Sequence, residues 1–270
     1  QCHYPDKPWE TARGAKRSPF HDRLAARGAY FRDVSGWESP AWYAPEGEDP
    51  GIERLSWGRQ NWFPWWEAEH RACREGVILM DMSFMGKFLV QGRDAGEYLD
   101  YLSANAVNDE PGRITYTQWL NEGGTLEADL TVIKFEDERF MVVTSDTAHR
   151  HTESWLKRHI GDERHVFVTD VTSAYGQLNV QGPRSRELLQ SLTSVDLSNE
   201  AFPFRAVSEV LATVVVERIV VVVERRGMDA EALAFTSDII PRILSQAYAL
   251  LGETGLAIAW LGKAVERGFI

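Results

Sequence analysis

The chain is poor in cysteine and has no long apolar run, and each of these shortages excludes a class of protein. Its two cysteines, Cys2 and Cys73, form neither a CxxC motif nor a metal-ligand spacing. Two isolated cysteines are more typical of a reducing compartment than of a disulfide-stabilised domain, although a disulfide between them is compatible with the sequence. The most apolar stretch, residues 210–223, is interrupted by Glu217 and Arg218 and is too short for a membrane span.

Clustered positive charge is also absent. The chain has 29 Lys and Arg against 40 Asp and Glu, a formal net charge of −11, and its basic residues are scattered. Nucleic-acid surfaces need clustered Lys and Arg, so we expect no nucleic-acid partner, and we expect no membrane partner. No targeting segment is visible, and the start at Gln1 rather than Met indicates a fragment or a processed product. We expect a cytoplasmic location in a bacterium or a mitochondrial-matrix location, with the cytoplasm preferred.

Two common motifs and a metal-ligand cluster are missing as well. Without a G-x-G-x-x-G opening we expect no dinucleotide fold, and without G-x-S-x-G there is no support for a serine nucleophile. His149 and His151 are two residues apart on a predicted helix, so they should point to different faces and be solvated rather than bind a metal. The 270 residues, 44% of them hydrophobic, suffice for one large domain or two small ones.

The segment from Tyr116 to Val132 is the most informative part of the chain. Gly123-Gly124 predicts a turn between two strands, because glycine reaches positive φ without steric cost. In the second strand, apolar residues alternate with polar ones, which predicts one buried and one opposite face. The buried face would hold Leu126, Ala128, Leu130 and Val132, and the opposite face Glu127, Asp129 and Thr131. Asp129 is then either a solvated side chain or part of a pocket wall.

A strand, a glycine and a helix occur twice in the sequence. Val90-Gln91-Gly92 and Val180-Gln181-Gly182 are each followed by leucines at helical spacing. This pattern predicts a duplicated α+β architecture, with a chance similarity of two strand–helix units as the alternative. Glycine stops and apolar periodicity further predict helices at 68–76, 93–103 and from Ser145 or Asp146 to Ile160, and strands at 77–82 and 86–90.

Tryptophan is concentrated near the N-terminus. Seven of the ten tryptophans lie within the first 66 residues, separated by Pro, Gly and charged residues with poor periodicity. The aromatic side chains of such an irregular segment must pack against an apolar surface. The segment either wraps around its own domain or packs on a partner domain outside this chain.

Several sets of residues carry a resemblance to a known family. Leu120-Asn121, Gly123-Gly124 and Asp129–Val132 are similar to the folate-binding hairpin of the aminomethyltransferases, the T-protein of the glycine cleavage system. They resemble more closely its fused form in dimethylglycine and sarcosine dehydrogenases. Residues 18–45 resemble the connector that joins the FAD oxidase half of those dehydrogenases to their folate half. Residues 170–174 and 181–185 also match, so the likeness extends from residue 18 to about residue 205.

The resemblance implies an α+β fold, the aminomethyltransferase (T-protein) folate-binding fold. This fold has two related βα-type subdomains and would here lack its final β-barrel subdomain. Residues 1–55 would form the aromatic-rich connector that follows an FAD oxidase domain, and residues 56–270 the folate-binding domain. FAD would belong to an N-terminal half outside this chain, either a fused oxidase domain or a separate subunit.

The resemblance also implies a function. The chain would bind tetrahydrofolate and capture the one-carbon unit of an oxidised methylamine as 5,10-methylenetetrahydrofolate. Asp129 would be the catalytic residue, and the folate would be bound by Met85, Tyr116, Asn121 and Asp229. The protein would then be the aminomethyltransferase-like part of an FAD-dependent oxidoreductase of the dimethylglycine or sarcosine dehydrogenase type.

The likeness weakens after Phe204. A family tyrosine falls on Val222, a family arginine on Ala264, and a family glutamate on Asp229, which is one methylene shorter. Charge-assisted hydrogen bonds contribute roughly 1.5–3 kcal/mol each, so these losses would weaken a folate site. Three hypotheses follow. The chain is an active folate module, a non-catalytic regulatory or partner-binding module like the regulatory subunit of pyruvate dehydrogenase phosphatase, or a diverged product whose C-terminal part packs differently.

Overall fold

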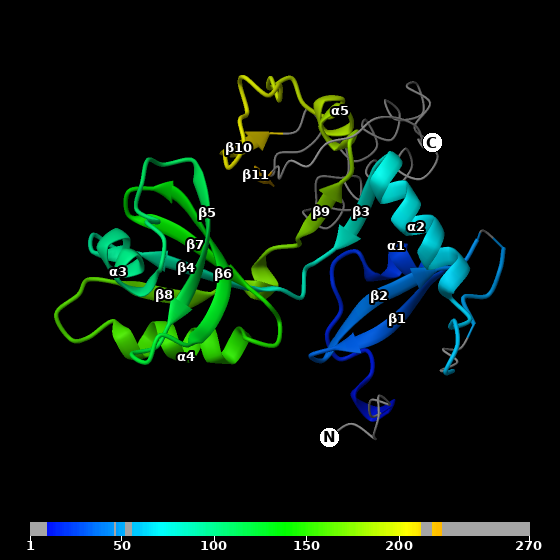
Figure 1. Cartoon of the computed structure of the whole chain (residues 1–270), viewed down its shortest axis with the longest axis horizontal. Helices are drawn as coiled ribbons and strands as arrows, with labels where there is room; N and C mark the ends of the chain where they lie inside the picture. The colour runs from blue at the N-terminus through cyan, green and yellow to red at the C-terminus, as the bar shows by residue number, and fades with distance from the viewer. Residues whose placement is uncertain (1–9, 46, 52–55, 212–217, 223–270) are drawn as a thin grey trace, which may run out of the picture.

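The largest sheet of the described residues is a five-stranded antiparallel sheet, at the left of the view in Figure 1. The computed structural model of the chain describes residues 10–45, 47–51, 56–211 and 218–222. Within these residues the strand order of the main sheet is β5-β6-β7-β4-β8. Its strands are β4 (Gly86–Gln91), β5 (Arg113–Leu120), β6 (Leu126–Glu136), β7 (Arg139–Thr144) and β8 (Phe167–Asp170).

Two helices, α3 (Ala95–Leu102) and α4 (His149–His159), cover one face of this sheet and bury the main core. Tyr98 of α3 is fully buried, and its hydroxyl donates a hydrogen bond to the carbonyl of Leu156 in α4 at 2.5 Å. The sheet contributes Phe88, Val90, Trp119, Ala128, Leu130, Val132, Phe140 and Val142 to the same cluster. Because side chains alternate along a strand, the residues between these ones lie on the other face of the sheet.

The predicted hairpin is formed by β5 and β6. Its turn is closed by the amide of Asn121, which donates to the carbonyl of Thr125 at 2.9 Å, and by Gly124 at φ 76°. Ala128, Leu130 and Val132 are buried as predicted, but Leu126 is exposed. The reason is a register shift at the tip, where Leu126 pairs with Leu120 beyond the regular alternation.

The helices begin at other residues than the sequence patterns predict. Helix α2 spans Phe63–Glu75 rather than 68–76, because Pro64 is accommodated in its first turn. Helix α4 begins at His149, after a turn in which the hydroxyl of Ser145 accepts a hydrogen bond from the Ala148 amide at 3.3 Å. The predicted strand at 77–82 is β3 (Ile78–Asp81).

The sequence repeat is a structural repeat. Strand β4 leads through Gly92 into α3, and β9 (Leu178–Gln181) leads through Gly182 into α5 (Ser185–Gln190). Gly92 and Gly182 have φ of 128° and 124°, a region that side chains rarely adopt. A Cβ atom on either glycine would overlap a backbone carbonyl, that of His165 or that of Gly76 respectively. The two units therefore turn in the same way for the same steric reason.

The two repeats exchange strands. Strand β8, which precedes the second unit, pairs with β4 of the first, and β3, which precedes the first unit, pairs with β9 of the second. Both pairs are antiparallel. Each repeat therefore contributes one strand to a sheet that contains strands of the other.

The N-terminal segment packs some of its aromatics on one another. It contains η1 (Glu10–Ala12), α1 (His21–Ala26), β1 (Ala29–Val34) and β2 (Trp37–Tyr43). Trp42 is fully buried between Tyr30 and Trp62, with ring centroids at 4.0 and 4.8 Å. Trp57 and Trp66 are exposed. Part of this segment thus wraps on itself, as one of the two alternatives predicted, while two of its rings face outward.

The last described strands are β10 (Val207–Leu211) and β11 (Arg218–Val222), which form an antiparallel pair next to β5. The amide of Val207 donates to the carbonyl of Gly112 at 2.7 Å. Strand β11 lies within the apolar stretch of residues 210–223, whereas Asp229 and Ala264 lie outside the described residues. None of the helices in the described part of the chain has the length and apolar character needed to cross a membrane.

Candidate functional site

The candidate site lies on the sheet face that α3 and α4 leave uncovered. Along this face, Tyr116 pairs with Thr131, Thr131 with Val143, and Val143 with Lys87, so one row of side chains crosses four strands. The neighbouring row contains a small apolar cluster built from Ile114, Ile133 and Met141. The face thus combines polar groups near the hairpin turn with an apolar floor beside them.

Tyr116, Gln118 and Asp129 form a polar cluster on this face. Gln118 lies directly opposite Asp129 in the register. Interaction of the Tyr116 hydroxyl with the Asp129 carboxylate raises the pKa of Tyr116, because the anion favours the neutral phenol, while interaction with Gln118 opposes this shift. Tyr116 and Asp129 are both exposed, so the pair is open to a ligand from solvent.

Met85 lies at the same end of the sheet as Asp129. Gly86 in β4 and Leu130 in β6 both pair with Thr144 of β7, and β4 and β6 run in the same direction. Met85 and Asp129 each precede those residues by one position. Neighbouring strands lie about 4.8 Å apart, so the two backbones are separated by roughly 10 Å at this edge. Tyr116, Asp129 and Met85, predicted from the sequence, therefore lie toward the same end of one sheet, here called the Tyr116–Asp129 edge.

Asn121 uses its side-chain amide within the hairpin turn. Its Oδ1 accepts hydrogen bonds from the amides of Gly123 and Thr125 at 3.0 and 3.1 Å. Its Nδ2 donates to Thr125 Oγ1 at 2.6 Å and to Glu127 Oε1 at 2.8 Å. The structure thus gives Asn121 a role in shaping the turn, next to the polar cluster rather than within it.

The two histidines of α4 are paired, in contrast to the expectation that they are merely solvated. His151 Nε2 lies 2.8 Å from Glu127 Oε2, and His149 Nε2 lies 2.9 Å from Asp170 Oδ2. A hydrogen bond from Asn121 and, to a smaller extent, one from His151 lower the pKa of Glu127. Helix periodicity alone did not show these contacts, because both carboxylates come from distant strands.

A buried lysine that strand alternation alone does not predict lies next to the site. Lys87 is only 2% exposed, and its Nζ donates to the carbonyls of Ser83 at 3.0 Å and Met85 at 2.7 Å. Burial lowers the pKa of Lys87 to about 8, and the charges of Asp81 and Asp170 oppose this shift. A single lysine within the strand Gly86–Gln91 is the signal that could have pointed to it.

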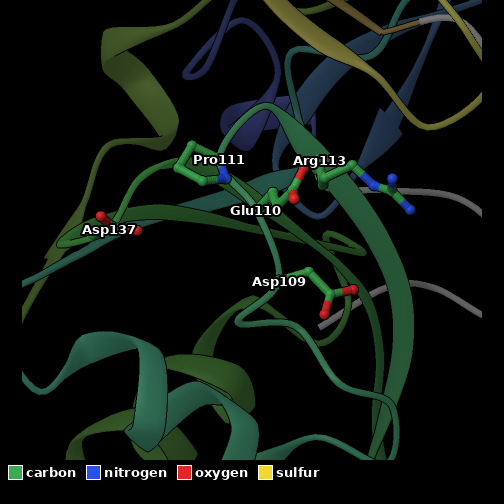
Figure 2. Close-up of a pocket in the computed structure, with 5 residues that line it drawn as sticks. All are labelled: Asp109, Glu110, Pro111, Arg113 and Asp137. Atoms are coloured by element: carbon green, nitrogen blue, oxygen red, sulfur yellow. The ribbon is translucent and has the colours of Figure 1, made fainter.

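An open hollow of about 600 Å³ lies elsewhere on the hairpin (Figure 2). Arg113 at its rim pairs with Lys134, at the end of the β5–β6 ladder far from the turn. The hollow is lined by Asp109, Glu110, Pro111, Arg113 and Asp137. None of these is a candidate site residue, and three carboxylates would repel an acidic ligand such as folate. We therefore place the candidate site at the Tyr116–Asp129 edge.

The sequence profile of the GCVT N-terminal domain matches residues 20–228. The chain belongs to this family. A glycine cleavage system aminomethyltransferase T from Bartonella henselae has the same fold, with a TM-score of 0.59 and 23% identity over 73% of this chain and 48% of that protein. The predicted α+β aminomethyltransferase fold is thereby confirmed.

Curated relatives of this GCVT domain include oxidoreductases and a regulatory subunit. A 4-methylaminobutanoate oxidase (formaldehyde-forming) from Paenarthrobacter nicotinovorans is 39% identical over 74% of the chain and 24% of its own length. The mitochondrial pyruvate dehydrogenase phosphatase regulatory subunit of Mus musculus is 31% identical over 72% and 23%. Human mitochondrial sarcosine dehydrogenase is 30% identical over 71% and 25%. The chain spans about a quarter of the length of these relatives.

Proposed function

We propose that the chain is a tetrahydrofolate-binding module that captures a one-carbon unit from an oxidised methylamine as 5,10-methylenetetrahydrofolate. The observation that carries this proposal is the exposed Asp129 carboxylate, which interacts with the exposed Tyr116 within a GCVT domain. The partly exposed Met85 at the same edge supplies an apolar side chain against which a flat pterin ring can lie.

The chemistry requires one folate nitrogen to attack the electrophilic carbon, the amine (or water, when formaldehyde is the donor) to leave, and the second folate nitrogen to bond to the same carbon. Each folate nitrogen loses a proton, one to the leaving group and one to a base. A carboxylate held by a phenol is suited to bind the N–H groups of the pterin and to accept that proton. Fixing the two reactants next to each other supplies much of the remaining acceleration. In this proposal Asp129 handles the proton, Tyr116 orients its carboxylate, and Met85 supports the ring. Asp229 is assigned to the folate as well.

The electrophile would come from a partner. One relative is named as formaldehyde-forming and another as a sarcosine dehydrogenase, and the chain spans only a quarter of either. We propose that an FAD-dependent oxidase domain or subunit generates the one-carbon unit. Residues 1–55 would be the connector to it, and residues 56–270 the folate-binding domain.

A second candidate function is a non-catalytic regulatory module. It is favoured by the 31% identity to the pyruvate dehydrogenase phosphatase regulatory subunit. The replacement of the family tyrosine and arginine by Val222 and Ala264 points in the same direction. In this case the domain would retain its fold, but the Tyr116–Asp129 edge would no longer bind folate.

The test supplies the one-carbon unit directly. Tetrahydrofolate and ¹³C-formaldehyde are mixed with the protein, and formation of methylenetetrahydrofolate is followed by NMR against the reaction in buffer. We expect the wild type to exceed the buffer rate and Asp129→Asn to lose most of that excess, at least tenfold. Asp137→Asn removes an exposed carboxylate from the turn between β6 and β7, and it should behave as the wild type. A wild-type rate equal to that in buffer would contradict the catalytic proposal.

A further inference from the structure

Two loops at the junction of the repeats have the same internal geometry. One follows β3 and the other follows β8. In the first, Asp81 Oδ1 accepts a hydrogen bond from the amide of Ser83 at 3.1 Å. In the second, Asp170 Oδ1 accepts one from the amide of Thr172 at 2.9 Å. Each aspartate therefore turns the chain at the end of its strand.

Each loop is bonded to the other repeat in a matching way. The amide of Gln177 donates to Ser83 Oγ at 3.0 Å, and its carbonyl accepts from the amide of Met82 at 2.9 Å. On the other side, the amide of Lys87 donates to Thr172 Oγ1 at 3.0 Å. The carbonyl of Lys87 accepts from the amide of Val171 at 2.9 Å. Lys87 and Gln177 thus occupy equivalent positions in the two repeats.

The side chains of these two equivalent residues meet at Met85. Lys87 Nζ donates to the Met85 carbonyl at 2.7 Å, and Gln177 Nε2 lies within hydrogen-bond distance of the Met85 sulfur at 3.7 Å. Gln177 Nε2 is also 3.3 Å from Asn179 Oδ1, while Gln177 Oε1 is buried without a hydrogen-bond partner. Met85 is therefore held at its backbone by the first repeat and at its side chain by the second.

We propose that Lys87 and Gln177 are positioning residues that hold Met85 against the folate. The proposal rests on the proposed function, because Met85 matters only if a ligand lies on the Tyr116–Asp129 edge. As a consequence, Gln177 of the second repeat affects the folate affinity of the site. All predicted contact residues of that site that lie within the described part of the chain belong to the first repeat.

The physical reason for such a clamp is the flexibility of methionine. Its unbranched side chain has three rotatable bonds, so a free Met85 would sample many rotamers and lose them on binding. A methionine already fixed in the empty protein avoids most of that loss, which is the usual benefit of preorganisation. The burial of Lys87 strengthens its hydrogen bonds, since they lie in a medium of low dielectric.

The test combines an NMR signal of Met85 with folate affinity. Gln177→Leu and Lys87→Met remove the donors at similar side-chain length. Gln181→Leu is the matched control, because Gln181 is an exposed residue of β9, the strand that begins directly after Gln177. The protein has five methionines, and Met85→Leu assigns the Met85 peak in a methyl-¹³C spectrum. We expect that peak to move and sharpen in the two clamp variants and to stay unchanged in the control.

Tetrahydrofolate affinity, measured by calorimetry, completes the test. We expect a fivefold to twentyfold weaker binding in Gln177→Leu and in Lys87→Met, and no change in Gln181→Leu. In a Met85→Ala background, Gln177→Leu should have no further effect, which a general loss of structure would not produce. Gln177→Leu keeps the test valid even if Lys87→Met fails to fold.

The outcomes separate the two proposals. Tight binding by the wild type together with unchanged affinity and an unchanged Met85 peak in both clamp variants would refute the clamp alone. Absence of binding by the wild type would refute the proposed function, and the folate role of the clamp with it. Weaker binding in the Met85→Ala background on adding Gln177→Leu would also contradict the clamp, because it would show an effect that does not pass through Met85.

Discussion

The side chains of Tyr116 on β5 and Asp129 on β6 interact across the strand pair that carries the candidate site. The two side chains are exposed, and they lie on the sheet face opposite to α3 and α4. This relationship has a direct consequence for the ionisation of the phenol. The carboxylate stabilises the protonated form of Tyr116, so its removal should make the phenol more acidic.

The first prediction concerns that ionisation. Asp129→Asn should lower the pKa of Tyr116 relative to the wild type, and Asp137→Asn should leave it unchanged. The eight tyrosines can be followed separately by a pH titration of ¹³Cζ-labelled tyrosine, with Tyr116→Phe to assign the signal. An identical titration of Tyr116 in wild type and Asp129→Asn would show that the pair does not exist in solution.

The second prediction concerns Lys87 and the pH dependence of stability. Its pKa of about 8 in the folded protein lies below the ordinary value of about 10.4, so the unfolded chain binds more protons between these values. Stability then rises with pH in this window. Relative to Lys87→Met, the wild type should gain on the order of 1 kcal/mol between about pH 8 and 9.5.

Chemical denaturation of both proteins across this range measures the gain. The other ionisable groups around the ammonium are Asp81 and Asp170, with His149 paired to the latter and Tyr43 near the former. All of them are present in both proteins, so their titration cancels in the difference. Parallel pH profiles of the two proteins would mean that Lys87 keeps an ordinary pKa.

The third prediction concerns the two glycines that start the repeated helices. Gly92→Ala and Gly182→Ala should each destabilise the fold by roughly 2–4 kcal/mol, because the new Cβ meets a carbonyl and φ is strained. Gly58→Ala, at a position with open space, should change stability by less than about 0.5 kcal/mol. Thermal melts of the three variants measure these changes in stability. An unchanged stability of Gly182→Ala would contradict the equivalence of the repeats.

The fourth prediction concerns Asn121. Since its amide makes four hydrogen bonds in the turn, Asn121→Ala should lower the free energy of unfolding by about 1–3 kcal/mol. Tetrahydrofolate affinity should fall less than in Asp129→Asn, because the amide faces the turn. A large loss of affinity with an unchanged melting temperature would instead make Asn121 a direct ligand contact.

Much of the local structure could be predicted from the sequence. The hairpin and the repeated strand–glycine–helix units depend on alternation and on glycine conformations, which are local properties. Leu126 was placed wrongly because the register shift at the hairpin tip depends on the pairing of two strands. Helix α2 begins earlier than the apolar periodicity predicts, because a proline is tolerated in the first turn of a helix.

The long-range arrangement could not be predicted in this way. The exchange of β3 and β8 between the repeats joins segments about 90 residues apart, and periodicity says nothing about such partners. The burial of Lys87 follows from this exchange, since its amide and carbonyl are bonded to the loop after β8. The contacts of His149 and His151 with distant carboxylates were missed for the same reason.

The most direct test of the account is calorimetric titration of tetrahydrofolate into the wild type, Asp129→Asn and Asp137→Asn. The account predicts micromolar binding by the wild type and by Asp137→Asn, and at least tenfold weaker binding by Asp129→Asn, a difference of about 1.4 kcal/mol or more. No heat of binding at millimolar tetrahydrofolate, or equal affinity of all three proteins, would contradict a folate site at the Tyr116–Asp129 edge.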